Sequence, residues 1–475
     1  MDDWRQASSD TFSLPTDADL AYSMIRGDRL PRKGLDFNMF AQDVVSDWAG
    51  NLSDIIDSAG GSPLVTLGQD EGGMSGRLSQ QWYYPFVSYT SVHTWWLNND
   101  LLWDVVSTKV PEKPDLVEET GLMRLENVDG ESWRTPEAAR RLLERKFAYA
   151  FMGEGAGAVE WCWNINEYQS TDNEVSIGLT RADGTMKIET EVLSEFANFF
   201  RKAGPYLQDY PVDPIVVVIP NSSFFTGMPH AYAGAKRLVR VLGENFGVAP
   251  SMLSEYKLTA GRLKGVKLVI VPDAGMISDS AAYELHQASL HGTKVLFTGA
   301  VTGNEYGKVT PDFKLLGINP GSAPVSRYEP TNWGTRKNNS GNFVTFGSEK
   351  PEHLLKSISP PLAALKGNIM DEPLPLEMAK QKGPLIDMLA AVMKYAGIKP
   401  HLFDSPLMSR VLYTGDAALI VCVNESSASL SRTVPAGDYK YEIPVEPGRS
   451  RLALVNLRDG RIIVATEGKP IVRVK

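Results

Sequence analysis

The sequence predicts an α/β protein built in three parts: the C-terminal half of a (β/α)8 barrel, a flavodoxin-like or amidotransferase-like doubly wound domain, and a small antiparallel β domain. Three observations predict this organisation. Strand-like apolar runs alternate with amphipathic helical segments over residues 1–205, the alternation continues around a fully apolar run in residues 206–400, and short alternating runs fill residues 401–475. A chain of 475 residues is long enough for several domains of roughly 100–200 residues each.

The first part contains strand and helix signals in alternation. The predicted strands are 63–67, 86–92, 114–118 and 157–163, and the predicted helices are 38–58, 135–151 and 191–202. Thr135 followed by Pro136 is a helix N-cap with proline at the first helical position, so a helix should begin there. A (β/α)8 barrel needs eight strands in about 250 residues, so this region holds about half of one. We expect the other half to precede Met1 or to come from another chain, because an open parallel sheet leaves two unpaired edges.

The second and third parts follow from the same kind of pattern. In the second, strands at 214–220, 266–271, 294–297 and 344–346 alternate with helices at 233–245, 280–290 and 385–395, and residues 326–342 resemble a polar loop. In the third, turn residues separate short runs at 410–413, 418–424, 429–434, 439–443, 451–455 and 461–465. That spacing indicates a small β-sandwich or barrel.

Composition excludes several classes of protein. The net charge of −9 and the lack of a basic stripe argue against nucleic-acid binding, and no uncharged apolar run approaches the roughly 18 residues that span a bilayer. Cys162 and Cys422 suggest no disulfide framework, and neither lies in the middle part, which excludes glutaminase chemistry there. The histidines and glycines form neither a metal motif nor a dinucleotide fingerprint, so we expect no metal and no cofactor. We expect a soluble protein; the cytoplasm is favoured, although the sequence does not determine the compartment.

Polar and aromatic residues gather where the predicted strands of the first part end. One predicted strand ends at Glu118 and Glu119, and the chain then turns at Gly121. The neighbouring strand ends supply imidazole, indole, amide and carboxylate groups: His93, Trp95, Trp96, Trp161, Trp163, Asn164, Gln69, Asp70 and Glu71. The carboxyl ends of parallel strands meet at one edge, so these groups should converge on a site that suits a carbohydrate. Solvated surface charges and core packing are the alternative interpretation of each residue.

The order of the three parts and these motifs resemble glycoside hydrolase family 42, a family of β-galactosidases, and related barrel enzymes of the same clan. The middle domain of that family is called the trimerisation domain. The resemblance spans nearly the whole chain, and its motifs lie between residues 63 and 166. It implies that Glu119, at the end of the seventh barrel strand, is the nucleophile. Glu118 competes for this role, but successive side chains of a strand point to opposite faces, so only one of the two should enter the pocket.

The resemblance also implies the surroundings of the nucleophile. His93 would orient Glu119, and the residues shaping the sugar site would be Trp95, Trp96, Trp161, Trp163, Asn164, Gln69, Asp70 and Glu71. The implied activity is that of a retaining β-glycosidase acting by double displacement on a β-galactoside or a related sugar. Three partners are expected. The first is this carbohydrate, the second is further copies of the chain, with a trimer as one alternative, and the third is a chain that supplies the N-terminal half of the barrel.

One element of the resembled chemistry is missing. Retaining glycosidases use two carboxylates about 5 Å apart, and in this clan the acid/base glutamate follows an asparagine at the end of the fourth strand. The first part has no such Asn-Glu pair ahead of its first helix, and Glu71 lies on the wrong strand to replace it. Three interpretations stay open: a piece of a longer protein, one subunit of a split enzyme, or a noncatalytic carbohydrate-binding or assembly module. The sugar and the linkage are not determined by the sequence.

Overall fold

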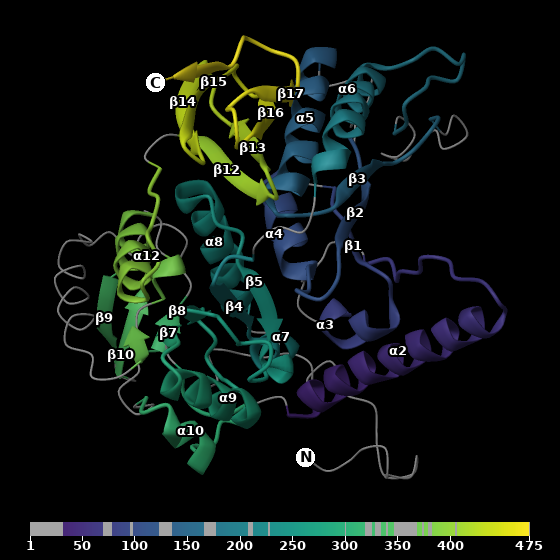
Figure 1. The fold of residues 1–475 in the computed structure, drawn as a ribbon. Coiled ribbons are helices and arrows are strands. Elements are labelled where there is room, and N and C mark those ends of the chain that lie inside the picture. Colours follow the sequence, from purple (N-terminus) through teal and green to yellow (C-terminus); the bar gives the residue numbers. More distant parts are fainter. Residues whose placement is uncertain are drawn as a thin grey trace.

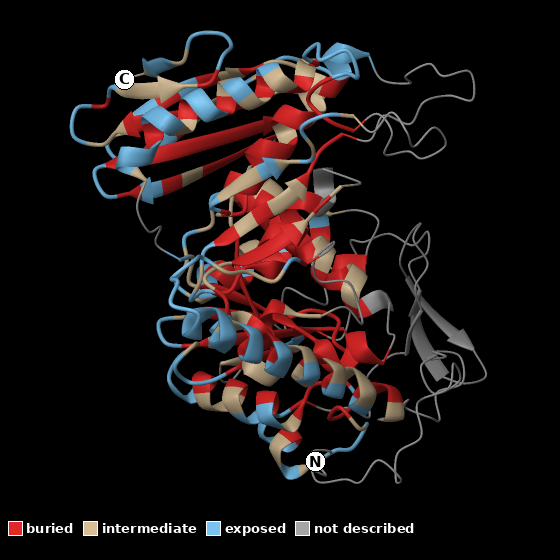
Figure 2. Ribbon diagram, turned by 90° about the vertical axis from the view of Figure 1, so that its right-hand side faces the viewer, coloured by how far each residue is buried: buried red, intermediate tan, exposed pale blue. Residues whose placement is uncertain are grey.

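The computed structural model describes residues 32–69, 78–95, 98–122, 135–165, 177–207, 212–226, 229–299, 301–318, 325–327, 334–338, 341–345, 368–372, 375–378, 382–403 and 406–474. They form a mixed α/β protein with parallel sheets in the first and middle regions and antiparallel sheets toward the C-terminus (Figure 1). Buried residues concentrate in the strands and on the inner faces of the helices (Figure 2). Within this described part of the chain, no helix combines the length and apolar character needed to cross a membrane.

The first region is a short parallel sheet covered by helices. Its strands pair in the order β1 (Thr90–His93), β2 (Asp115–Thr120), β3 (Gly157–Glu160). The crossovers that parallel strands require are α4 (Asn98–Thr108) and α5 (Pro136–Met152), and α6 (Ile188–Ala203) follows β3. Val92 and Val117 are fully buried in one core with Leu143 of α5 and Phe196 of α6. The helices therefore cover one face of the sheet.

Two predictions for this region have different outcomes. Helix α5 begins where the sequence placed it, because the Thr135 hydroxyl accepts a hydrogen bond from the Ala138 backbone N–H and Pro136 occupies the first turn. The strand predicted at 63–67 is wrong: this segment has no regular secondary structure and joins no sheet. It makes only scattered bonds to the chain before and within β1, such as Ser88 N–H to the Val65 carbonyl, and Leu64 is 80% exposed.

A long helix and several short ones complete the first region. Helix α2 (Arg32–Ser58) packs against α3 (Gln80–Tyr83), η3 (Tyr84–Phe86) and α7 (Asn221–Phe225) of the middle region. The Ser46 hydroxyl donates to the Trp82 carbonyl at 2.8 Å, and the Asn38 side-chain amide donates to the Phe225 carbonyl at 3.0 Å. Figure 1 shows α2 running along the edge of the molecule.

The middle region is a parallel five-stranded sheet with a core on each face. Its order is β11 (Ile369–Glu372), β7 (Lys294–Thr298), β6 (Leu268–Val271), β4 (Ile215–Ile219), β5 (Ser251–Ser254). In β4, Ile215, Val217 and Ile219 face one core, and Val216 and Val218 face the other. An entirely apolar strand is expected where both faces are covered, which is why this run was recognisable in the sequence.

Helices of the middle region supply the two covering layers. Helices α8 (Pro229–Phe246) and α12 (Gly383–Tyr395) contribute to the core that contains Ile215, whereas α9 (Asp279–Leu290) and α10 (Pro311–Leu315) contribute to the other. Four short segments complete the region: η4 (Gly204–Tyr206) and α7 (Asn221–Phe225) precede α8, η5 (Glu255–Lys257) lies between α8 and α9, and η7 (Leu376–Met378) lies between α10 and α12. The polar loop predicted at 326–342 is wrong in part, since β8 (Val325–Arg327), β9 (Gly334–Asn338) and β10 (Gly341–Thr345) form a separate small sheet.

The last region is two antiparallel sheets facing one another. One has the order β12 (Leu407–Thr414), β13 (Ala417–Asn424), β16 (Ser450–Asn456), β17 (Ile462–Ala465), and the other β14 (Leu430–Ala436), β15 (Tyr439–Val445), β18 (Val472–Val474). Ile420 and Cys422 of β13 pack with Val434, Tyr441 and Ile443 in the core between the sheets. The other face of β13 packs against α5.

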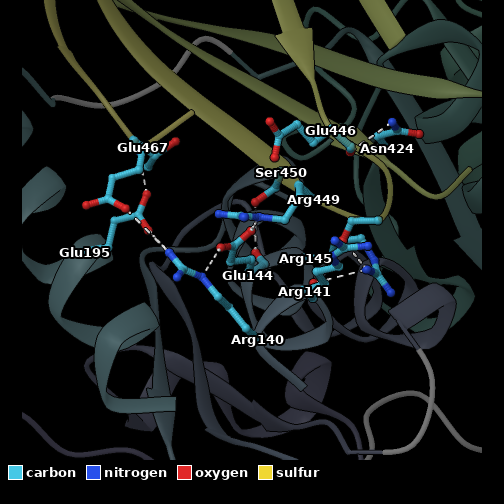
Figure 3. Close-up of polar contacts among 12 residues, drawn as sticks. Arg140, Arg141, Glu144, Arg145, Glu195, Asn424, Glu446, Arg449, Ser450 and Glu467 are labelled. Atoms are coloured by element: carbon cyan, nitrogen blue, oxygen red, sulfur yellow. Dashed lines mark hydrogen bonds and ion pairs between the residues drawn. The ribbon is translucent and has the colours of Figure 1, made fainter. Parts of the chain in front are cut away.

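A network of charged residues joins α5 to this last region (Figure 3). The buried Glu144 carboxylate binds the guanidinium groups of Arg140 and Arg449, and the Ser450 hydroxyl donates to the Glu144 carbonyl. Arg145 binds the Glu425 carboxylate and the Gly448 carbonyl. Helix α5 thus contacts the parallel sheet on one side and the β domain on the other.

Candidate active site

The site is built at the carboxyl ends of β1 and β2. The two strands run parallel, His93 is the register partner of Glu119, and the Thr94 N–H donates to the Glu119 carbonyl at 2.9 Å. This pairing places the side chains that follow β1 beside those that end β2. The convergence expected from the sequence is therefore present for His93, Trp95 and Glu119.

The Glu119 carboxylate is held between an indole and an imidazole. Trp95 donates its Nε1–H to Glu119 Oε1 at 2.8 Å, and Glu119 Oε2 lies 3.6 Å from His93 Nδ1. The side chains of His93 and Glu119 are 25% and 23% exposed, so the pair is partly shielded yet reaches solvent. One carboxylate oxygen thus accepts a hydrogen bond from the indole, and the other lies beside the imidazole.

The neighbouring Glu118 does not obey simple strand alternation. The register with β1 shifts between Val92 and His93, so two residues of β2 oppose one of β1, as in a β-bulge. A Cβ added at Gly68 would lie 3.5 Å from Glu118 Oε2 and 3.7 Å from His93 Nε2, so both groups face this glycine. Glu118 Oε2 is buried without a hydrogen-bond partner among the described residues. Because the bulge interrupts the alternation, the side chains of Glu118 and Glu119 both lie near His93, and the expectation that only one of them enters the site is not met.

Gly121 permits the close packing that brings Trp95 to the carboxylate. A Cβ at this position would lie 2.8 Å from both the Trp161 carbonyl oxygen and Cζ3 of the Trp95 ring. The Trp161 N–H donates to the Thr120 carbonyl at 2.8 Å, which keeps the chain after β3 beside the end of β2. The turn glycine noticed in the sequence thus has a steric function.

A buried lysine of α5 binds the two chain segments that follow β1 and β2. Lys146 of α5 is 2% exposed, and its ammonium donates to the Trp95 carbonyl at 2.5 Å and to the Gly121 carbonyl at 2.7 Å. The sequence does not reveal this residue, because nothing in the residue pattern distinguishes a buried lysine in an amphipathic helix from a solvated one. Its partners are backbone carbonyls, which sequence patterns do not identify.

Glu160 ends β3 close to this lysine. Burial raises the pKa of the Glu160 carboxyl to about 8; the Lys146 ammonium opposes that effect and the Glu189 carboxylate adds to it. Its Oε2 atom is buried without a hydrogen-bond partner in the described part of the chain. A carboxyl group with this pKa is largely protonated at neutral pH. A carboxylate nucleophile has to be ionised, so Glu160 does not suit that role.

The remaining predicted site residues divide into three groups. Trp161 and Trp163 are 48% and 68% exposed on the segment after β3, where Asn164 is also exposed and donates its side-chain amide to the Ile165 carbonyl. Gln69 is buried, and its backbone carbonyl accepts the His93 N–H at 2.7 Å. Trp96, Asp70 and Glu71 lie outside the described residues. The described residues include no cluster of three or more His, Cys, Asp or Glu side chains arranged to hold a metal ion.

Comparisons with known proteins identify the fold. Neither the models of protein families nor the curated proteins gave a match. Solved structures did: Gan42B, a GH42 β-galactosidase from G. stearothermophilus, matches with a TM-score of 0.61 at 12% identity, over 96% of this chain and 71% of its own. The cold-adapted β-galactosidase from Rahnella sp. R3 matches with a TM-score of 0.63 at 11% identity, over 91% of this chain and 69% of its own.

A protein named for a different activity has a similar fold. The GH42 exo-carrageenase from Bacteroides ovatus matches with a TM-score of 0.55 at 14% identity, over 90% of this chain and 56% of its own. The chain therefore has a fold similar to that of the GH42 β-galactosidases over most of its length, as the sequence resemblance indicated. At these identities the likeness concerns the fold, and the chemistry depends on the residues at the site.

Proposed function

We propose that this chain is the nucleophile-bearing part of a retaining β-glycosidase that acts on a β-galactoside or a related sugar. The observation that carries the proposal is the Glu119 carboxylate, bound by the Trp95 indole and lying beside His93 at the carboxyl end of a parallel strand. The fold, similar to that of β-galactosidases, supports it. The domain roles follow: residues 1–205 carry the catalytic half-barrel, 206–400 an assembly domain of the trimerisation type, and 401–475 a β-sandwich.

In this proposal Glu119 attacks the anomeric carbon of the sugar and forms a glycosyl ester that water later hydrolyses. Trp95 binds Oε1 and thereby leaves Oε2, on the His93 side, as the attacking oxygen. The exposed indoles of Trp161 and Trp163 supply faces on which a sugar ring can stack. Trp96, Gln69, Asp70, Glu71 and Asn164 remain proposed sugar contacts on the strength of the sequence alone.

In this proposal the acid/base carboxylate lies outside the described residues of this chain. It belongs to the other half of the barrel, which is either part of a longer chain or a separate polypeptide and which packs beside the β1–β2–β3 sheet. General acid catalysis contributes about 10²–10⁴-fold in rate, so the chain by itself would hydrolyse substrates with poor leaving groups slowly.

The test uses a substrate whose leaving group needs no proton. A 2-deoxy-2-fluoro-β-galactosyl fluoride loses fluoride without general acid catalysis, and its C2 fluorine slows hydrolysis of the ester, so the intermediate accumulates. We expect the wild-type chain to gain the mass of one fluorosugar, with the label on the peptide that contains Glu119, as read by mass spectrometry.

Two variants separate Glu119 from its neighbour. Glu119→Gln should take up no label, whereas Glu118→Gln should still be labelled at Glu119. Label on Glu118, or undiminished labelling of Glu119→Gln, would contradict the assignment of the nucleophile. A wild-type chain that takes up no label from gluco-, manno- and galacto-configured reagents would argue against the glycosidase.

A noncatalytic carbohydrate-binding module is the second candidate. The half-exposed indoles of Trp161 and Trp163 favour it, because stacking on a sugar requires no acid. Titration calorimetry with galacto-oligosaccharides distinguishes the two. Binding that Glu119→Gln retains and Trp163→Ala loses, together with no fluorosugar labelling, would support the module.

A further inference from the structure

Lys146 is a buried cation whose hydrogen bonds join the two chain segments that form the candidate site. Its ammonium binds the Trp95 and Gly121 carbonyls, which lie just beyond the paired part of β1 and β2. The register of the two strands ends with His93 opposite Glu119. A side chain of α5 therefore holds the two segments together at the point where the ladder of the sheet stops.

The chemistry of an ammonium group suits this position. It has three N–H donors and no acceptor, so one such group can bind two carbonyls at once. Hydrogen bonds from a charged donor are shorter and stronger than those from a neutral one, and a buried site strengthens them further. Lys146 is 2% exposed, and a buried charge is costly unless its hydrogen bonds are made. The two bonds therefore fix the backbone of both segments relative to α5.

The backbone position of Trp95 decides where its indole points. The ring packs over Gly121, where an added Cβ would lie 2.8 Å from Cζ3, and the ring centroid lies 5.8 Å from the Lys146 ammonium. From there the indole Nε1–H donates to Glu119 Oε1 at 2.8 Å. A continuous series of contacts thus runs from the ammonium, through the backbone and ring of Trp95, to the carboxylate.

Helix α5 is itself held in place on both sides of this lysine. The Arg145 guanidinium and the Tyr149 hydroxyl both donate to Glu425 Oε1 of the β domain, at 3.1 Å and 3.0 Å. Phe147 is buried in the core beneath the parallel sheet. Groups on an element that is fixed by packing and by further hydrogen bonds can hold a site in one geometry, and Lys146 lies on such an element.

We propose that Lys146 is a positioning residue of the candidate site. Its ammonium holds the Trp95 and Gly121 carbonyls together and thereby aims the Trp95 indole at the Glu119 carboxylate. The role of Glu119 as nucleophile rests on the proposed function, whereas the hydrogen bond between the indole and the carboxylate does not. Lys146 acts through Trp95, and this role requires no contact between the lysine and a sugar.

The first experiment observes the Trp95 indole N–H by two-dimensional NMR of protein with 15N-labelled tryptophan. The chain has ten tryptophans, and Trp95→Phe identifies the signal by its disappearance. A hydrogen bond to a carboxylate moves an indole proton downfield and slows its exchange with water. In Lys146→Met this proton should move upfield and exchange about 10- to 100-fold faster, as expected for the loss of a hydrogen bond to a charged group.

Lys109→Met is the matched control. Lys109 is another lysine buried on a helix, and its ammonium donates to the Gly153 carbonyl at 3.3 Å and to the Glu154 carboxylate at 2.6 Å. Its removal also leaves buried polar groups without a partner, but the Trp95 signal should stay where it is in the wild type. Lys146→Gln is the second variant in case Lys146→Met does not fold. Its side chain is neutral and one atom shorter, so it cannot reach both carbonyls, and the same change of the signal is expected.

The second experiment measures labelling by 2-deoxy-2-fluoro-β-galactosyl fluoride as a function of reagent concentration. Lys146→Met should lower the rate at saturation about 10- to 100-fold, because a misplaced reacting group slows the chemical step. The concentration that gives half of this rate should change less than about twofold, because Lys146 does not bind the sugar. In a Trp95→Phe background the same substitution should slow labelling by less than about twofold more, because its effect passes through the indole.

The outcomes separate this role from the proposed function. A Trp95 signal that is unchanged in a folded Lys146→Met or Lys146→Gln variant, or that moves equally in Lys109→Met, would overturn the role of Lys146. So would effects of Lys146→Met and Trp95→Phe that multiply fully in the double variant. A wild-type chain that takes up no label, combined with the expected change of the NMR signal, would remove the glycosidase and leave the positioning role of Lys146 supported.

Discussion

The position of the Glu119 carboxylate depends on a glycine two residues further along the chain. Trp95 can donate to Glu119 only if its ring packs over the turn at Gly121, where a side chain would meet both that ring and the Trp161 carbonyl at 2.8 Å. Lys146 fixes the same turn by binding the Trp95 and Gly121 carbonyls. The orientation of the Glu119 carboxylate, the proposed nucleophile, thus depends on Gly121 and Lys146 through their contacts with Trp95.

The variant Gly121→Ala tests this dependence. The added methyl group must displace Trp95 or Trp161, so we expect the opening free energy of the β2 amides, measured by hydrogen exchange, to fall by about 1–3 kcal/mol. Fluorosugar labelling of Glu119 should slow in parallel. Gly204→Ala is the control, because a Cβ there meets nothing within 4 Å, and its effect should stay within about 0.5 kcal/mol. Equal effects of the two substitutions would show that Trp95 is not held by the Gly121 contact.

The sequence predicts some of these residues and not others for a physical reason. Glu119, His93 and Trp95 were found because strand ends meet at one edge of a parallel sheet, which is a property of topology. The bulge that brings Glu118 toward Gly68 is a local change of register and leaves no pattern in the residue types. Lys146 was missed because its role is defined only by two carbonyls that lie far away in the chain.

At the scale of the element, α5 links the candidate site to the C-terminal β domain. One side of the helix carries Lys146 and faces the strand ends, and the other carries Glu144 and Arg145, which bind residues of the β domain (Figure 3). Burial raises the pKa of the Glu144 carboxyl, and the guanidinium groups of Arg449 and Arg140 oppose that effect. The network stabilises the junction only while all of its members are present.

Removing one charge from the network should therefore weaken the junction. In Glu144→Gln the side chains of Arg140 and Arg449, which are 18% and 16% exposed, lose their shared anion, and we expect a loss of about 1–3 kcal/mol in the opening free energy of the α5 amides, measured by hydrogen exchange at pH 7. Glu137→Gln removes an exposed pair with Arg141 on the same helix and should cost at most about 0.5 kcal/mol. A Glu144 variant as stable as the Glu137 variant would show that the junction depends on apolar packing alone.

Elements with a strong periodic signal were predictable, whereas short polar ones were not. The buried run of β4 and the capped start of α5 agree with the sequence analysis. Strands β5, β11 and β18 were missed: β5 begins and ends with serine, β11 ends in two carboxylates, and β18 has only three residues. Each is a strand because a neighbour pairs with it, and pairing is a tertiary property.

At the scale of the whole molecule, several buried carboxyl groups have a raised pKa and therefore keep their protons to a higher pH than exposed carboxyl groups do. Burial raises the pKa of Glu377 and of Glu160 to about 8, and that of Glu255 and Asp115 to about 7, although hydrogen bonds from Thr298, Ser222 and Thr90 oppose the effect at three of them. They lie in both parallel-sheet regions, so the effect is not confined to the candidate site. In the unfolded chain the same groups ionise near pH 4.

The sign of the resulting pH dependence follows from proton binding. Between about pH 4.5 and 8 the folded state holds protons that the unfolded state has released, so raising the pH in this range favours unfolding, by up to about 1.4 kcal/mol per pH unit for each group. Glu154 acts in the opposite sense: burial would raise its pKa, but the charges of Arg410 and Lys109 lower it below the ordinary value of 4.5, which places its contribution below this range. We therefore expect the thermal midpoint, measured by calorimetry, to fall from pH 5 to pH 8.

Glu377→Gln isolates one of these contributions. Its carboxyl is fully buried and accepts the Thr298 hydroxyl, so a neutral amide keeps the shape and removes the titration. The variant's thermal midpoint should decline less steeply than that of the wild type between pH 5 and 8, and the gap between the two should narrow or reverse at the alkaline end. Glu137→Gln, whose side chain is 51% exposed, should keep the wild-type slope. A midpoint that rises with pH over this range, or a Glu377→Gln variant with an unchanged slope, would show that these carboxyl groups ionise in the folded protein and find their counter-charges there.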